Sequence, residues 1–148
     1  MEPPVGNEQD NGGQRMPSVR VRIEVPRGSF VKRGEGGVEF VSPVPCPFNY
    51  GSVIGTVGED GDALDAIVLG GRLRGGEVVE VPTQGVVRFE DDGKADDKLI
   101  CGDVAPSQGA VAALDAFFRV YAPVRRLLNR ARGRRGRTRY GGVEIGTQ

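Results

Sequence analysis

The first regular pattern along the chain is an alternation of apolar and charged residues. Apolar residues occupy every second position from Val19 to Val25, and the positions between them hold arginines and Glu24. Successive side chains of a strand point to opposite faces, so this pattern predicts a half-buried strand whose polar face carries Glu24.

Six more short apolar segments are bounded by Gly, Pro or Asp-Gly turns, and each predicts a strand. They cover residues 37–41, 53–57, 64–69, 77–81, 85–89 and 98–101. Glycine supplies 24 of the 148 residues, which favours a turn-rich β architecture. Closely spaced short strands of this kind are typical of a small barrel or sandwich.

One segment has the spacing of a helix. Apolar residues recur at helical intervals from Val111 to Tyr121, and Ser107 precedes them as a candidate N-cap. Pro123 is expected to stop or kink this helix, with a further turn or two through residues 124–130. We expect its apolar stripe to pack on the outside of the strands.

The two ends of the chain differ from its middle. Residues 1–17 contain little to bury and are predicted to form a disordered arm. Residues 18–131 are predicted to form one domain, since the length fits a single compact core. Residues 132–148 are assigned to an Arg/Gly-rich tail, expected to be mobile over 132–140.

Composition excludes several classes of site. The chain has no histidine, which excludes His-based catalysis and typical zinc sites, so any metal must be bound by oxygen. Cys46 and Cys101 are expected to be free, buried thiols in a reducing compartment. No apolar run approaches the ~20 residues of a membrane span, and no signal peptide is evident, so a cytoplasmic location without membrane contact is expected.

The charges are equal in number but unevenly placed. Lysine and arginine total 20, as do aspartate and glutamate. Residues 59–103 hold twelve acidic and five basic residues, whereas residues 125–139 hold eight arginines and no acidic residue. The net charge of zero therefore cancels an acidic middle against a basic end.

Two acidic clusters carry the candidate chemistry. Asp60, Asp62 and Asp65 place three carboxylates within six residues, and a second run spans residues 91–97. Carboxylates so close together repel one another unless cations lie among them. The alternatives are an Asp-Gly turn with solvated side chains for the first cluster and a solvated hairpin turn for the second. Together with lysines and tyrosines, the clusters would suit Mg²⁺-assisted phosphoryl chemistry.

Four segments in order resemble family I soluble inorganic pyrophosphatases. They are Ile23-Glu24-Val25-Pro26-Arg27-Gly28-Ser29-Phe30-Val31-Lys32; Pro47-Phe48-Asn49-Tyr50-Gly51 with Asp-Gly-Asp-x-x-Asp starting ten residues after its Tyr; residues 85–91 with Asp96 and Lys98; and Phe117-Phe118-Arg119-Val120-Tyr121. The resemblance runs from Val19 to Tyr121. It implies a mainly β (α+β) fold, a small closed OB-like five-stranded barrel with one or two C-terminal helices packed outside.

The resemblance also implies an activity and the residues that perform it. The activity is Mg²⁺-dependent hydrolysis of inorganic pyrophosphate to two phosphates, with several Mg²⁺ ions in each site. Asp62 would be the general base for a water shared by two metals. The metal ligands would be Asp60, Asp65, Asp91, Asp96 and, through water, Glu24. The phosphate-binding residues would be Lys32, Tyr50, Lys98 and Tyr121, the first three of which would also count as catalytic. Bacterial members are commonly hexamers, so a homo-oligomer is expected by resemblance.

The departures from the family pattern concern cations that bind phosphate. The carboxylate expected two residues after Lys32 comes at Glu35, no Lys or Arg occurs from residue 34 through 71, and Ala122 stands where the family has Lys. Arg33 or an arginine from residues 125–139 would then supply the missing charge. Alternatively, the protein is a catalytically weak or inactive relative that binds metal or phosphate.

A further alternative is an OB-like module that binds RNA or another polyanion through its arginine-rich end. Aromatic residues make up only 6% of the chain, and an acidic barrel face would repel a phosphate backbone. Nucleic acid is therefore the less favoured partner.

Overall fold

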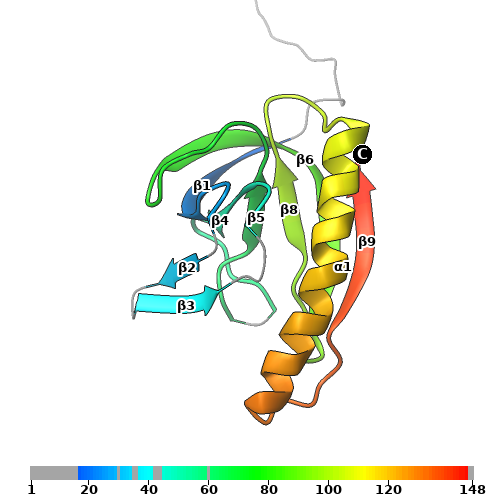
Figure 1. The fold of residues 1–148 in the computed structure, drawn as a ribbon. Helices are drawn as coiled ribbons and strands as arrows, with labels where there is room; N and C mark the ends of the chain where they lie inside the picture. The colour runs from blue at the N-terminus through cyan, green and yellow to red at the C-terminus, as the bar shows by residue number, and fades with distance from the viewer. Residues whose placement is uncertain (1–16, 30, 35–36, 42–44, 60, 147–148) are drawn as a thin grey trace, which may run out of the picture.

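The computed structural model describes residues 17–29, 31–34, 37–41, 45–59 and 61–146, and only the backbone of 31–34 and 37–41. Five strands hydrogen-bond in a closed ring, in the order β1 (Ser18–Val25), β4 (Asn49–Val53), β5 (Asp65–Val68), β8 (Lys98–Cys101) and β6 (Val78–Asp91). The ring closes because β6 also pairs with β1, from Ser18 opposite Pro82 to Arg22 opposite Val78. The closed five-stranded arrangement with a C-terminal helix outside it confirms the predicted fold class (Figure 1).

The long strand β6 differs from the prediction of two strands at 77–81 and 85–89. Its first part pairs with β1 and its second part with β8 and β9 (Arg139–Ile145), with a register irregularity between Thr83 and Gly85. Gly85 is required there, because a Cβ on it would lie 2.3 Å from the carbonyl oxygen of Glu144 in β9. The turn that Gly and Pro predicted is thus an irregularity within one strand.

The predicted strand at 53–57 is wrong in position, since β4 ends at Val53. Gly55 has a φ of 84°, and the Thr56 hydroxyl donates to the carbonyl oxygen of Val53, so a turn follows the strand. Gly51 within β4 has no room for a side chain, because its Cβ would lie 2.0 Å from the carbonyl oxygen of Arg22 in β1. Close packing of these two strands therefore selects glycine at this position.

Two short β elements lie outside the ring. The strands β2 (Val31–Gly34) and β3 (Gly37–Val41) pair with each other in a separate two-stranded sheet, and β3 matches its prediction. Their register shifts between Lys32 and Arg33. The small strand β7 (Lys94–Ala95) pairs with the end of β6 through a turn in which Asp92 and Gly93 both have positive φ, a geometry typical of a tight hairpin.

The helix α1 (Gln108–Ala131) is longer than predicted. The side chain of Ser107 accepts a hydrogen bond from the amide of Ala110 at 3.1 Å, which confirms the predicted N-cap. Pro123 lies inside the helix without ending it. The buried face of α1, including Leu114 and Phe118, packs with Phe89 of β6 and with Phe48, which directly precedes β4, and the helix lies alongside β9 (Figure 1). A second core is formed by Val21, Ile23, Val53, Ala66, Val68, Val81 and Cys101.

The C-terminal segment does not behave as the expected mobile tail over its whole length. Residues 139–145 form β9, which pairs antiparallel with β6 from Gly85 opposite Ile145 to Glu90 opposite Arg139. Backbone pairing along this edge outweighs the weak strand pattern of an Arg- and Gly-rich sequence. The arm predicted at 1–17 lies, except for Pro17, outside the described residues.

Within the described ranges, no helix combines the length and the apolar character that crossing a membrane would require.

Candidate functional site

The centre of the candidate site is a buried lysine held by two carboxylates. β5 and β8 run parallel with Asp65 opposite Lys98. The Nζ atom of Lys98 donates to Oδ2 of Asp65 at 2.9 Å and to Oδ2 of Asp96 at 2.8 Å. The Lys98 side chain is 1% exposed, whereas those of Asp65 and Asp96 are 17% and 16% exposed. The ammonium group is therefore covered, and the two carboxylates reach the surface.

Burial and neighbouring charges have opposite effects on the pKa values in the triad of Lys98, Asp65 and Asp96. Burial alone would lower the pKa of Lys98, but Asp65 and Asp96 raise it above the usual range, so the lysine stays charged. Burial raises the pKa of Asp96 to about 6, and the adjacent Asp65 adds to this rise, although Lys98 opposes it. One cation between two carboxylates leaves an excess of negative charge that a further cation would stabilise.

Two tyrosines lie next to the triad. The Lys98 Nζ atom is 6.0 Å from the ring centre of Tyr50 and 5.2 Å from that of Phe89. The ring of Tyr121, from α1, lies 5.5 Å from that of Phe89. Burial raises the pKa of both tyrosines, and Asp65 adds to the rise for Tyr50. Both phenols are therefore neutral near pH 7 and keep an O–H that can donate to an anion.

Asp91, at the end of β6, is bound by the helix. Arg125 approaches Oδ2 of Asp91 with Nη2 at 3.1 Å and Nε at 3.2 Å. Asn129 donates to Oδ1 at 2.7 Å. Burial alone would raise the pKa of Asp91, but the hydrogen bonds from Asn129 and Arg125 hold it below the usual range. Asp91 is therefore an ionised carboxylate with a guanidinium beside it.

The other predicted site residues lie as follows. Glu24 on β1 is half-buried, and the hydroxyl of Ser52 on β4 donates to its Oε2 at 2.5 Å. Asp62 is exposed in the loop between β4 and β5. Asp60 and the side chain of Lys32 lie outside the described residues. The structure thus brings together Asp65, Asp96, Lys98, Tyr50 and Tyr121, with Asp91 attached to the helix through Arg125.

The described carboxylates are not gathered into a metal cage. In this part of the chain, which does not include Asp60, no three Asp, Glu or Cys side chains converge as a metal site. Asp65 and Asp96 converge on Lys98 instead. The donors are nevertheless carboxylate oxygens with excess negative charge, which fits a hard cation such as Mg²⁺.

Arg125 and Asn129 were not identified as individual site residues from the sequence. Arg125 follows Tyr121 by four residues, and residues four apart lie on the same face of a helix. That spacing is the signal that could have singled out Arg125 among the eight arginines. Ala122, which stands where a lysine was expected, is buried in the core against the ring.

Comparison with known proteins gives a consistent result. A family model described as inorganic pyrophosphatase matches residues 21–129. The inorganic pyrophosphatase of Sulfolobus acidocaldarius is 38% identical over 98 residues, covering 60% of this chain and 57% of that protein. That of Haemophilus influenzae is 43% identical over 92 residues, covering 56% and 52%. The chain thus spans little more than half the length of these curated relatives.

The fold agrees with the same assignment. The crystal structure of inorganic pyrophosphatase from Thermus thermophilus has a TM-score of 0.67 and 26% identity to this chain, covering 93% of this chain and 86% of that one. The family match includes the ring strands and most of α1, and therefore every described residue of the site around Lys98 and Asp91. On these grounds the chain belongs to the inorganic pyrophosphatase family.

Proposed function

We propose that this protein is an inorganic diphosphatase that hydrolyses pyrophosphate to two phosphates with Mg²⁺. The observation that carries the proposal is the charged Lys98 held between Asp65 and Asp96 beside two neutral tyrosines. This arrangement offers cation ligands and phosphate donors side by side. Family membership supports the same activity.

The metal side of the proposed site consists of carboxylates. The residues that would hold Mg²⁺ are Asp60, Asp65, Asp91, Asp96 and, through water, Glu24. When bound, Mg²⁺ lowers the pKa of a coordinated water and neutralises charge on the phosphate oxygens. Glu24 accepts a hydrogen bond from the hydroxyl of Ser52, which fixes the orientation of its carboxylate.

The phosphate side consists of donors held in place by packing. An ammonium group has three N–H donors, and Lys98 directs two of them to Asp65 and Asp96. Because the ammonium is covered, Lys98 would act on a bound phosphate mainly through its positive charge behind the two carboxylates. Tyr50, whose side chain is hydrogen-bonded with Asp65, and Tyr121 would donate hydrogen bonds from their hydroxyls to phosphate oxygens when substrate binds. Lys32 would add positive charge from β2.

Arg125 is proposed to replace the cation missing at position 122. Its side chain is 22% exposed and lies at Asp91, where substrate phosphate would arrive with metal. A guanidinium can bind phosphate with two parallel hydrogen bonds. Of the sources considered for the missing charge, the contact with Asp91 favours Arg125.

Asp62 is proposed as the general base. It lies three residues before Asp65, in an exposed loop where its carboxylate can accept a proton from the attacking water. The homo-oligomeric (hexameric) state and the cytoplasmic location stay predictions.

The test is phosphate release from pyrophosphate with and without millimolar Mg²⁺. We expect Mg²⁺-dependent turnover by the native sequence and a loss of about 10² or more in the Asp62→Asn variant. Release by the native sequence no greater than by Asp62→Asn would overturn the proposal. If Mg²⁺ then still raised the melting temperature, a metal-binding relative without activity would replace it.

A further inference from the structure

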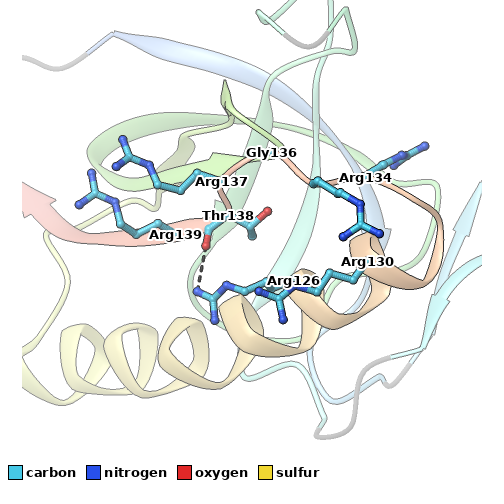
Figure 2. A pocket seen from close by; sticks show the side chains of 8 residues that line it. Arg126, Arg130, Arg134, Gly136, Arg137, Thr138 and Arg139 are labelled. Carbon is cyan, nitrogen blue, oxygen red and sulfur yellow. Dashed lines mark hydrogen bonds between the residues drawn. The ribbon is translucent and has the colours of Figure 1, made fainter.

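The arginine-rich segment forms a cavity at the C-terminal end of α1. The cavity has a volume of about 540 Å³ and is lined by arginines 126, 130, 134, 135, 137 and 139, with Gly136 and Thr138 between them. Figure 2 shows Arg126 and Arg130 on α1, Arg134 on the turn beyond the helix, Arg137 on the segment that leads into β9, and Arg139 at the start of β9. We call this the arginine pocket.

A backbone turn at the end of the helix forms the pocket. Gly133, with a φ of 77°, donates its amide to the carbonyl of Arg130 at 3.0 Å. The amide of Arg134 donates to the carbonyl of Asn129 at 2.7 Å. This pair of bonds is the Schellman motif, which satisfies the last carbonyls of a helix. The arginine side chains are therefore not needed to cap α1.

Among the residues that the structure describes, only Arg126 and Arg137 of the arginines in this lining have a side-chain hydrogen bond. The Nη2 atom of Arg126 donates to the carbonyl of Thr138 at 2.9 Å (Figure 2), and Nε of Arg137 donates to Glu90 at 2.8 Å. For Arg130, Arg134, Arg135 and Arg139, no ion pair with a described carboxylate is formed. Four permanently charged groups thus line one pocket without an ion pair to the described residues.

Glu90 and Asp92 contact the lining of the pocket, and each is bound by a lining residue. Glu90 pairs with Arg137, and Oδ1 of Asp92 accepts the amide of Gly136 at 2.8 Å. Asp91 is bound by Arg125 and Asn129. The side chain of Thr138 is buried and accepts from Asn129 at 3.0 Å, on the side of Asp91. The pocket and the site around Asp91 therefore lie on two sides of this short segment.

We propose that the arginine pocket binds a compact anion carrying two or more linked phosphate groups. Guanidinium groups match phosphate oxygens in two-pronged hydrogen bonds, and the volume lies within the range of small-ligand pockets. Single-stranded nucleic acid fits less well, because stacking of bases needs aromatic side chains and the lining contains none. This inference stands apart from the proposed catalysis, because it needs no metal.

Titration calorimetry with inorganic tripolyphosphate tests the proposal. Excess EDTA keeps metal-dependent binding at the acidic site silent. A pocket variant carries Arg130→Gln, Arg134→Gln and Arg135→Gln. The matched control loses the same charge at exposed positions outside the pocket, with Arg20→Gln, Arg22→Gln and Arg74→Gln. We expect one bound anion per chain in the native sequence, and affinity at least about tenfold weaker in the pocket variant but not in the control.

Three results would overturn the proposal. The first is an equal loss of tripolyphosphate affinity in both triple variants. The second is binding of sulfate as tight as that of tripolyphosphate. The third is binding of oligouridylate that is tighter than that of tripolyphosphate and that the pocket variant loses. The last result would reassign the pocket to RNA. Thermal unfolding without ligand shows whether both triple variants fold. If the pocket variant does not fold, the single variant Arg134→Gln takes its place in the titration.

Discussion

Lys98 shows how one residue serves both the fold and the proposed chemistry. A buried ammonium is stable only because Asp65 and Asp96 lie within 2.9 Å of it. In turn, the two carboxylates tolerate each other only because the lysine lies between them. Removing the lysine therefore leaves two carboxylates without their cation, whereas removing one aspartate still leaves an ion pair between Lys98 and the other.

Replacing Lys98 should lower the stability of the fold by an amount that depends on Mg²⁺. We expect Lys98→Met to lower the free energy of unfolding by about 3 kcal/mol in EDTA, because two half-buried carboxylates lose their cation. Millimolar Mg²⁺ should restore part of this loss. Its stabilising effect on Lys98→Met should be larger than its stabilising effect on the native sequence. Urea unfolding with and without Mg²⁺ measures both effects. Equal stability of the two proteins in EDTA would contradict the role of the triad.

Arg125 belongs to the phosphate side in our proposal, and its substitution separates binding from stability. We expect Arg125→Gln to lower kcat/KM for pyrophosphate by about 10-fold to 100-fold, since a charge-assisted contact to phosphate is lost. Arg125→Lys should recover part of it. The control is Arg119→Gln, an arginine of the same helix whose ion pair with Asp115 lies outside the site. An equal loss in this control would show that the effect comes from the helix and not from the contact.

The two thiols give a pH dependence with a definite sign. Burial raises the pKa of Cys46 to about 11 and that of Cys101 to about 12. Above pH ~8.5 the thiols ionise in the unfolded chain but not in the folded one, so stability falls as pH rises until the folded pKa is reached.

We expect each thiol to lower the free energy of unfolding by about 2 kcal/mol between pH 8 and pH 10. Urea unfolding of the native sequence and of Cys46→Ala at both pH values measures the share of Cys46. The stability difference between the two proteins should shrink at pH 10. A constant difference would mean that Cys46 is not shielded from ionisation.

Among the secondary-structure elements, α1 and β9 depend on each other. The hydroxyl of Tyr140 in β9 donates to Oδ1 of Asp115 in α1 at 2.7 Å, and its ring stacks 6.0 Å from that of Phe118. The strand is thereby fixed to the helix as well as to β6. This contact explains why an Arg- and Gly-rich segment forms an ordered edge.

Tyr140→Phe tests this contact with little change in shape. We expect a loss of about 1 kcal/mol in the free energy of unfolding, because the hydrogen bond is removed while the ring packing stays. Chemical denaturation monitored by helical circular dichroism provides the measurement. Asp115→Asn in the Tyr140→Phe background should then cost less than in the native sequence, since the two residues share one bond.

For the molecule as a whole, the C-terminal strand completes the sheet. β9 covers β6 from Gly85 to Glu90, and its Tyr140 and Val143 pack on the core that contains Phe89 and Phe118. An edge without this cover would expose backbone groups and apolar surface together.

Deleting residues 136–148 should therefore destabilise the fold by at least ~3 kcal/mol, through lost backbone pairing and lost apolar burial. Deleting residues 1–16 is the comparison, and from their composition we expect less than ~0.5 kcal/mol. Thermal and urea unfolding of the two truncated chains measure the difference. If the C-terminal deletion lowered the free energy of unfolding no more than the N-terminal deletion does, β9 would not contribute to the stability of the fold.

The sequence by itself determined the features that depend on neighbours along the chain. The alternation at 19–25, the Ser107 cap and the apolar segments at 64–69 and 98–101 predicted β1, α1, β5 and β8, because side-chain periodicity and capping act within a few residues. The same local pattern misplaced β4 and divided β6 into two strands. The spacing from Tyr50 to Asp65 and from Asp91 to Lys98 indicated the family, since a site built on strand ends keeps its local spacing.

Only the tertiary structure decided which distant residues meet. Asp65 faces Lys98 because β5 and β8 pair in parallel, Arg125 reaches Asp91 because α1 packs across the end of β6, and residues 139–145 become a strand because β6 offers them an edge. Local pattern could not predict these contacts. They depend on closing the ring and burying its faces, and their free energy comes from groups far apart in the chain.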